Sequence, residues 1–100
     1  MTDTQTITNK QATFVYDEPP KYNVIMHNDD VTPMDFVVDV LCNIFRKPKD
    51  DAETLMLRIH NEGSAVVGTY FKDIAESKTR IALELARKNG FPLKITIERV

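Results

Sequence analysis

This 100-residue chain has a single cysteine, Cys42, and lacks any long apolar run. One cysteine forms neither an internal disulfide nor a cysteine-based zinc site, and this composition favours a reducing compartment. The apolar runs, such as residues 36–38, fall far short of the roughly 20 residues that a membrane-spanning helix needs. The N-terminus also lacks the apolar core of a signal peptide. We therefore expect a cytoplasmic protein with no membrane partner.

The chain has little net charge, formally −2, with a pI near 5.6. A protein that grips nucleic acid by its phosphates needs a basic surface, so the composition predicts no nucleic-acid partner. No serine or cysteine lies in a nucleophile elbow or glycine-rich turn, and the sequence has neither an i, i+4 histidine pair nor a calcium-binding loop. The best enzymatic alternative is an acid and base pair from Asp29 or Asp30 with His60. We favour binding, without a cofactor or metal, over that alternative.

What the chain has is 42% hydrophobic residues, enough for one core in one small domain. Residues 1–20 are polar and end in a double proline, which predicts a disordered, flexible N-terminal extension. The apolar cluster at 14–16 in this extension is either inert or held by a partner. The folded domain is expected at residues 21–100.

Apolar periodicity divides the expected domain into strands and helices. Strand patterns lie at 22–27, 64–70 and 93–98, and helical patterns lie at 33–46, 49–61 and 72–88. The order β-α-α-β-α-β predicts an α+β sandwich, in which a small three-stranded, largely antiparallel sheet packs on three helices. Gly68 inside the second strand indicates a bulge or a close backbone approach.

Each predicted helix has an apolar face that we expect to be buried. These faces comprise Phe36, Val37, Val40, Leu41, Ile44 and Phe45 in the first helix, Ala52, Leu55, Met56 and Ile59 in the second, and Ile74, Ile81, Ala82 and Leu85 in the third. On the third helix we expect outward-facing charges at Glu76, Lys78, Arg80, Glu84 and Arg87. Thr32 before Pro33 predicts a threonine cap and a first helix that begins at Pro33.

The segment between the first strand and the first helix carries the side chains best suited to bind a ligand. Its polar groups are hydrogen-bond acceptors, as is a neutral histidine near the end of the second helix: Asn28, Asp29, Asp30 and His60. Acceptors beside an apolar hollow suit a cation attached to a hydrophobic body, such as a free protein N-terminus with a large first side chain. Taken singly, each of these residues has a structural explanation instead. The polar residues are typical of a turn or a helix end, and Met34 and Met56 are typical of side chains that fill gaps in a core.

Several stretches taken together resemble one family. They are Asn-Asp-Asp-Val-Thr-Pro-Met-Asp-Phe-Val at 28–37, Leu-Met-Leu-Arg-Ile-His at 55–60, Gly68, Ala-Glu-Ser-Lys at 75–78 and Phe-Pro-Leu at 91–93. Over residues 21–100 the chain resembles the ClpS family. The resemblance implies a non-enzymatic adaptor of the bacterial N-end rule, which binds substrates with N-terminal Leu, Phe, Tyr or Trp. It further implies that these substrates, called N-degron proteins, are delivered to a ClpA-like AAA+ unfoldase and its ClpP protease.

The resemblance also implies roles for individual residues. The substrate's α-amine would be held by Asn28, Asp29, Asp30 and His60. The pocket for the first side chain would be lined by Thr32, Met34, Val37, Met56, Ile59 and Leu93, with Met34 excluding β-branched residues. Asp73 and Lys78 match positions that dock on the unfoldase's N-terminal domain, and the extension matches a segment that the unfoldase engages.

The chain departs from the family pattern at two positions in the domain. Phe71 stands where many members have a threonine that caps the third helix, and His27 replaces an apolar strand residue. An alternative function also remains open: a protein-docking domain of similar fold that recognises no N-terminus, as in the C-terminal domain of the ribosomal stalk protein. The Asn-Asp-Asp stretch and His60 are the features that favour the adaptor.

Overall fold

The computed structural model describes residues 18–100, which form three helices and three strands. In chain order these are β1 (Lys21–His27), α1 (Met34–Asn43), α2 (Lys49–Glu62), β2 (Ser64–Phe71), α3 (Lys72–Lys88) and β3 (Lys94–Arg99). The predicted order β-α-α-β-α-β is confirmed. Predictions about residues 1–17, including the cluster at 14–16, lie outside the described residues. Within residues 18–100, the helices fall short of the length and apolar character that a membrane span requires.

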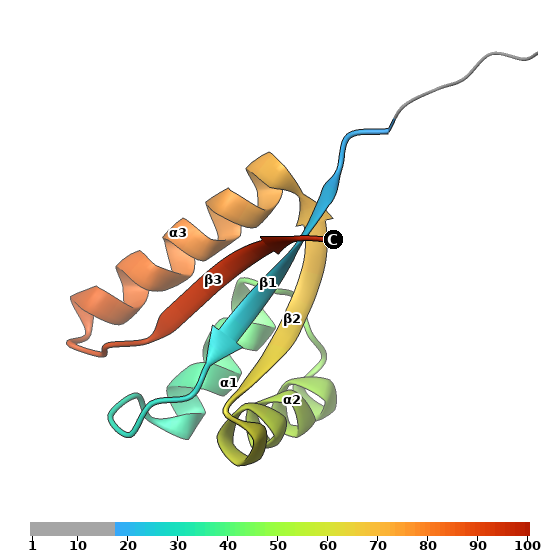
Figure 1. The fold of residues 1–100 in the computed structure, drawn as a ribbon. Helices are drawn as coiled ribbons and strands as arrows, with labels where there is room; N and C mark the ends of the chain where they lie inside the picture. Colours follow the sequence, from blue (N-terminus) through green and yellow to red (C-terminus); the bar gives the residue numbers. More distant parts are fainter. Residues whose placement is uncertain (1–17) are drawn as a thin grey trace, which may run out of the picture.

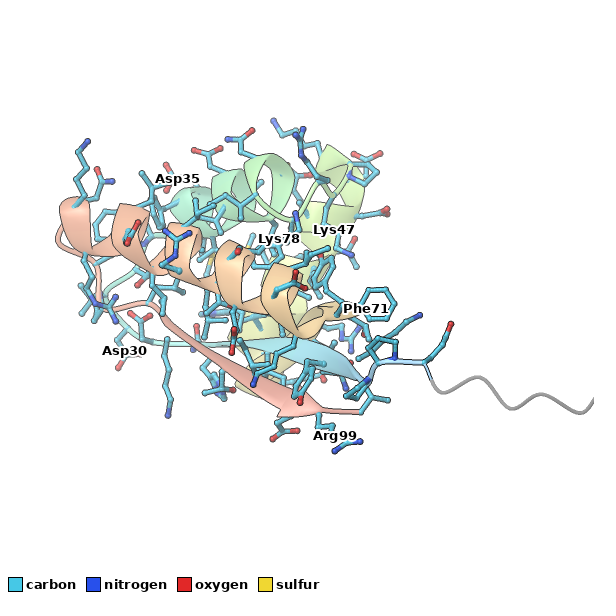
Figure 2. The ribbon with its side chains drawn as sticks, turned by 90° about the horizontal axis from the view of Figure 1, so that it is seen from above. Asp30, Asp35, Lys47, Phe71, Lys78 and Arg99 are labelled. Atoms are coloured by element: carbon cyan, nitrogen blue, oxygen red, sulfur yellow. The ribbon has the colours of Figure 1, made fainter. Side chains whose placement is uncertain are left out.

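The sheet has β1 at its centre, with β2 and β3 antiparallel to it on either side (Figure 1). The helices cover one face of this sheet, as predicted (Figure 2). On that face Val24, Met26 and Val67 are buried. The other face is more polar, and there His27 Nε2 lies 2.8 Å from Thr96 Oγ1. The resemblance leads us to expect an apolar residue at position 27, and this contact on the open face accommodates the histidine found there.

Gly68 marks a bulge, as the sequence predicts. The pairing of β1 with β2 shifts there, because Val24 faces Gly68 whereas Ile25 faces Val66. The extra residue in β2 bends the strand locally. A Cβ atom at position 68 would also lie only 2.6 Å from Cε2 of the Tyr70 ring, so only glycine leaves room for that ring.

The predicted threonine cap of α1 is wrong. Pro33 occupies the N-cap position without a side-chain capping bond, and the helix begins at Met34. The Thr32 hydroxyl instead donates to Asp29 Oδ2 over 2.8 Å. The cap fails because the carboxylate three residues earlier recruits the threonine.

The C-terminal end of α1 also comes earlier than predicted, at Asn43 rather than near Arg46. The N–H groups of Ile44 and Phe45 both donate to Val40 O, and Arg46 then adopts a left-handed conformation with φ of 60°. A left-handed residue turns the chain away from the helix axis. The predicted inner face is confirmed, since every member is buried or half-buried: Phe36, Val37, Val40, Leu41, Ile44 and Phe45.

α2 matches its prediction closely. Its buried residues are Ala52, Leu55 and Ile59, and Met56 is half-buried. The helix ends at Glu62, and Gly63 follows with φ of 93°. Only glycine adopts this left-handed conformation without a steric cost, so the predicted stop signal is confirmed.

The predicted inner face of α3 is mostly wrong. Ile74, Ile81 and Leu85 are 45%, 47% and 41% exposed, respectively. The buried residues are instead the small ones, Ala75, Thr79, Ala82 and Ala86. α3 packs directly on all strands of the sheet, and small side chains let its backbone approach them. Its bounds are as predicted, with Phe71 at the N-cap position making no side-chain capping bond.

Candidate functional site

The loop between β1 and α1 is tied to the end of α2. The backbone N–H of Asn28 donates to Gly63 O over 2.9 Å. His60 lies three residues before Gly63, in the last turn of α2. The bond therefore brings the loop that carries Asn28 to the helix end that carries His60, and both side chains are exposed. Figure 1 shows this loop and the end of α2 at the same end of the molecule.

Asp29 holds the loop in shape. Its Oδ1 accepts from Val31 N at 2.8 Å and Thr32 N at 2.7 Å, in addition to the bond from the Thr32 hydroxyl to Oδ2. Burial favours a higher pKa for this carboxyl. The hydrogen bonds from Thr32 and Val31 outweigh it and, with the charge of Arg87, lower the pKa of Asp29 below its ordinary value of 3.8. Asp29 therefore stays ionised, with both oxygens engaged inside the loop.

Asp30 differs from its neighbour because its side chain is exposed. In Figure 2 it lies at the end of the molecule formed by the loop, on the sheet side, whereas Asp35 projects from the helix layer. Asn28, Asp30 and His60 are thus the exposed members of the predicted amine-binding set, whereas Asp29 is half-buried and shapes the loop.

The residues predicted for the side-chain pocket divide into buried and more exposed members. Val37, Ile59 and Leu93, from α1, α2 and the segment before β3, are 8%, 3% and 1% exposed and belong to one hydrophobic core. Met56 packs against this core, and Met34 is 43% exposed. Thr32 is half-buried and is held within the loop by its bonds to Asp29.

A hollow of about 450 Å³ lies between α1 and α2. Met34 and Met56 both line it. The other lining residues were not predicted as site residues: Asp35, Val38, Asp39, Lys49, Glu53 and Leu57. The sequence carried only part of this signal, because Asp35 and Asp39 are four residues apart and therefore share one side of α1.

The predicted docking residues Asp73 and Lys78 both lie on α3. Asp73 is exposed in the first turn, where its Oδ1 accepts from Ile74 N at 3.0 Å. Lys78 is half-buried rather than fully outward, because its Nζ donates to Ile44 O at 2.8 Å and lies 5.5 Å from the centre of the Tyr70 ring. Five residues correspond to roughly 140° around a helix, so the two side chains leave α3 in different directions.

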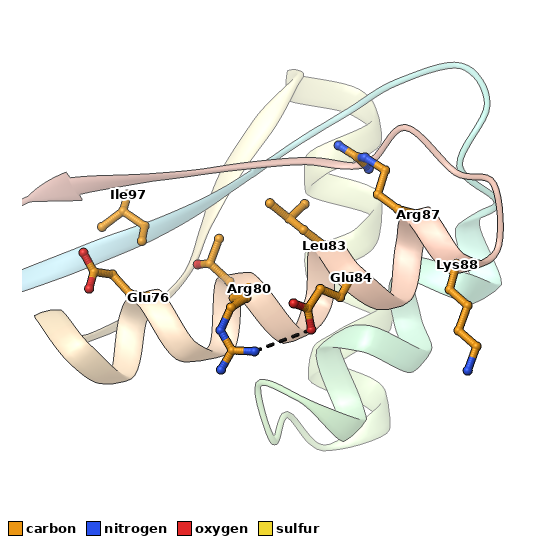
Figure 3. A pocket seen from close by; sticks show the side chains of 8 residues that line it. Glu76, Arg80, Leu83, Glu84, Arg87, Lys88 and Ile97 are labelled. Carbon is orange, nitrogen blue, oxygen red and sulfur yellow. Dashed lines mark hydrogen bonds and ion pairs between the residues drawn. The ribbon is translucent and has the colours of Figure 1, made fainter.

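A larger hollow, of about 770 Å³, lies between α3 and β3 (Figure 3). Leu83 and Ile97 supply apolar lining, and Arg80 and Glu84 form an exposed ion pair of 3.5 Å at its side. None of the residues predicted for the ligand site lines it. Within residues 18–100, no three His, Cys, Asp or Glu side chains are grouped as a metal site would require.

The fold and the loop define a class of small α+β domain, in which acceptors at a strand end lie beside apolar residues of two helices. Comparison with known protein families assigns the chain to one such class. A family model described as "ATP-dependent Clp protease adaptor protein ClpS" matches residues 17–96. The chain therefore belongs to the ClpS family.

Individual relatives cover most of the chain. The ATP-dependent Clp protease adapter protein ClpS of Treponema denticola is 52% identical over 83 residues, which are 83% of this chain and 82% of that protein. The protein of the same name from Desulforapulum autotrophicum is 46% identical over 81 residues, 81% of this chain and 78% of that protein. A solved structure, Agrobacterium tumefaciens ClpS2 bound to L-phenylalaninamide, matches with a TM-score of 0.80 and 42% identity, covering 83% of this chain and 100% of that chain.

Proposed function

We propose that this protein binds substrates by an N-terminal Leu, Phe, Tyr or Trp and delivers them to a Clp-family AAA+ unfoldase for degradation by ClpP. The ligand of the related A. tumefaciens structure, L-phenylalaninamide, is the observation that carries the proposal. This small molecule combines a free α-amine with a large apolar side chain. The acceptors of the β1–α1 loop and the apolar residues beside them suit those two groups.

For the α-amine we propose Asn28, Asp30 and His60 as the groups that accept its hydrogen bonds. Their exposure and the tie between Asn28 N and Gly63 O support this assignment. Asp29 contributes by shaping the loop and by adding a negative charge that attracts the ammonium group. Each hydrogen bond to a charged amine contributes about 1.5–3 kcal/mol.

For the first side chain we propose the pocket whose floor is Val37, Ile59 and Leu93. Met34 and Met56 stand at its mouth, and methionine side chains are unbranched and adapt their shape to a ring or a leucine. A β-branched residue carries an extra group next to the backbone, where Met34 would crowd it. Burial of the side chain contributes about 1.5–3 kcal/mol. With two or three bonds to the amine, and after the entropy of association, this supports a micromolar dissociation constant.

The proposed partner is the N-terminal domain of a ClpA-like unfoldase, docked at Asp73 and Lys78 on α3. Residues 1–20 are then the extension that the unfoldase engages during delivery, and residues 21–100 are the adaptor domain. The family name describes adaptors, which fits binding without catalysis. Because a protease that depends on ATP works where ATP is available, we place the protein in the cytoplasm.

The test is fluorescence anisotropy of short peptides that differ only in residue one: Phe, Leu, Ile, Lys and acetylated Phe. We expect micromolar or tighter binding of Phe and Leu only, lost on acetylation because the amine no longer carries a charge. Equal affinity for all five peptides would refute the amine and side-chain pocket.

Variants assign the binding to the proposed residues. Asn28→Ala and His60→Ala should each lower the affinity for the Phe peptide by about ten-fold to a hundred-fold, since each variant removes a hydrogen bond to a charged group. Asn61→Ala is the matched control, because Asn61 is exposed on the same helix next to His60. An equal loss in this control would mean that α2 is disturbed as a whole.

A second candidate is a protein-docking domain that recognises no N-terminus. The exposed Ile74, Ile81 and Leu85 on α3 favour it, since large apolar side chains at the surface mark many protein contacts. The peptide experiment separates the two candidates, because only the adaptor discriminates among first residues.

A further inference from the structure

The segment that follows α3 is attached to the last turn of that helix through both polar backbone groups of Phe91. The backbone N–H of Phe91 donates to Ala86 O over 2.9 Å. Phe91 O accepts a hydrogen bond from Arg87 Nη1 over 2.8 Å. Pro92, the next residue, has no N–H to add to these two bonds. The way in which the chain leaves α3 therefore depends in part on the side chain of Arg87.

This segment leads directly into the pocket proposed for the first side chain of a substrate. Leu93, two residues after Phe91, is buried and belongs to the proposed floor. The ring of Phe91 packs edge-on against that of Phe36, with 4.9 Å between their centres and 68° between their planes. Phe36 precedes Val37, another residue of the proposed floor, in α1. We therefore expect a displacement of Phe91 to disturb the pocket from both α1 and the segment before β3.

Arg87 also acts on the loop that carries the proposed amine-binding groups. Burial favours a higher pKa for the Asp29 carboxyl, whereas hydrogen bonds from Thr32 and Val31 and then the positive charge of Arg87 lower this pKa. Figure 3 shows the Arg87 side chain leaving the last turn of α3 toward the strands, and that of Lys88 leaving in the opposite direction. One guanidinium group thus bonds the segment before β3 and attracts a carboxylate of the β1–α1 loop.

We propose that Arg87 is a positioning residue for substrate binding, which holds residues 91–93 against α1 and attracts the β1–α1 loop to the same end of α3. The inference rests on the proposed function and deepens it, because it adds a residue of α3 that supports the site without touching the substrate. Arg87 is exposed, so water screens its charge and the expected effect on affinity is moderate.

The test measures by fluorescence anisotropy how tightly three variants bind a short peptide that begins with Phe. Arg87→Gln removes the charge and should raise the dissociation constant by about three-fold to ten-fold. Arg87→Lys keeps a positive charge and a donor, so it should recover most of this loss. Lys88→Gln is the matched control, because it removes the same charge from the neighbouring exposed residue, and its dissociation constant should equal that of wild type.

A second measurement separates positioning of the site from a merely structural role at the end of α3. In an NMR titration of the side-chain carboxyls, the pKa of Asp29 should rise in Arg87→Gln and stay lowered in Arg87→Lys and Lys88→Gln. A weaker affinity of Arg87→Gln with an unchanged pKa of Asp29 would mean that Arg87 only caps α3, and this result would overturn the inference.

Three further results would also overturn the inference and leave the proposed function standing. They are wild-type affinity in Arg87→Gln, an equal loss of affinity in Lys88→Gln, and equal losses in Arg87→Gln and Arg87→Lys. Failure of the wild-type protein to bind the peptide would instead overturn the proposed function itself, and the role of Arg87 with it.

Discussion

α1 and α3 are both amphipathic helices on the same side of the sheet, yet they bury opposite kinds of residue. α1 turns large side chains inward, namely Val37, Val40 and Leu41. α3 turns alanines inward and leaves Ile81 and Leu85 about half exposed. The difference follows from what each helix touches, because α1 packs mainly on α2 whereas α3 lies on every strand of the sheet.

The comparison shows that hydrophobicity alone does not identify the buried face of a helix. A helix that lies close to a sheet needs small inward residues, and any large apolar residues it carries are then pushed to its flanks. The flanking residues Ile81 and Leu85 and the predicted docking residues Asp73 and Lys78 all belong to α3. The proposed substrate site, on α1 and α2, and the proposed docking site, on α3, therefore use different helices. This separation is what an adaptor needs to hold two partners at once.

The largest expected effect on stability is the difference between a leucine of α1 and a leucine of α3 when each is replaced by alanine. Leu41→Ala in α1 removes a side chain with no exposed surface and should lower the free energy of unfolding by about 2–5 kcal/mol. Leu85→Ala in α3 removes a side chain that is 41% exposed and should cost less than about 1 kcal/mol. Urea denaturation of both variants checks this, and similar losses would mean that α3 packs through its large residues after all.

The next largest effect should come from enlarging the inner face of α3. Ala82→Leu forces a large side chain between the helix and the sheet and should destabilise the fold by about 1–3 kcal/mol. Ser77→Leu makes a comparable enlargement at an exposed position of α3 and should change stability by no more than about 0.5 kcal/mol. Thermal unfolding of the two variants gives the comparison. A stable Ala82→Leu variant would show that α3 has room above the sheet.

A smaller effect should come from the direct link between the two helices. Lys78→Met removes the hydrogen bond to Ile44 O at the end of α1, and we expect a loss of about 0.5–1.5 kcal/mol. Lys88→Met changes an exposed lysine of the same helix and should leave the unfolding midpoint in urea nearly unchanged. Equal midpoints for the two variants would leave Lys78 with no structural role and strengthen its assignment to docking.

The smallest effect should come from the loop before α1, and it depends on pH. The pKa of Asp29 is lowered in the fold, so its ionised form stabilises the protein above pH 3.8, and this contribution is lost as pH falls through the lowered pKa. Wild type should therefore exceed Asp29→Asn in stability at neutral pH, with the gap closing in acid. Unfolding followed from about pH 7 to about pH 2.5 checks the trend. If the difference in stability between the two proteins is constant over this range, the charge of the Asp29 carboxylate does not contribute to stability.

Much of the fold could be predicted from the sequence because its signals are local. Gly63 ends α2 through its left-handed backbone, and Gly68 lies at the bulge of β2. The start of α1 was mispredicted although Thr32 and Pro33 form a regular cap pattern, because the carboxylate of Asp29 takes up the threonine hydroxyl. A cap rule counts the residues that follow the cap and does not consider a competitor in the preceding loop.

The candidate site was only partly accessible from the sequence. Resemblance pointed to Asn28 and His60, which are far apart in the chain, and the bond between Asn28 N and Gly63 O explains how the fold brings their segments together. The carboxylates of the α1–α2 hollow, such as Asp39 and Glu53, looked like ordinary solvent-facing charges. Only the packing of one helix beside the other places them around the same hollow.

The sequence by itself determined the order of the elements and the approximate bounds of all of them except the C-terminal end of α1, because periodicity, glycine and proline act within a few residues of the chain. Tertiary structure alone decided which side of α3 is buried and which charges surround the α1–α2 hollow. The physical reason is that the distance between a helix and its neighbour is set by all the side chains between them. Ala75 and Ala86 permit the close contact of α3 with the sheet, but only the assembled sheet makes that contact the stable one.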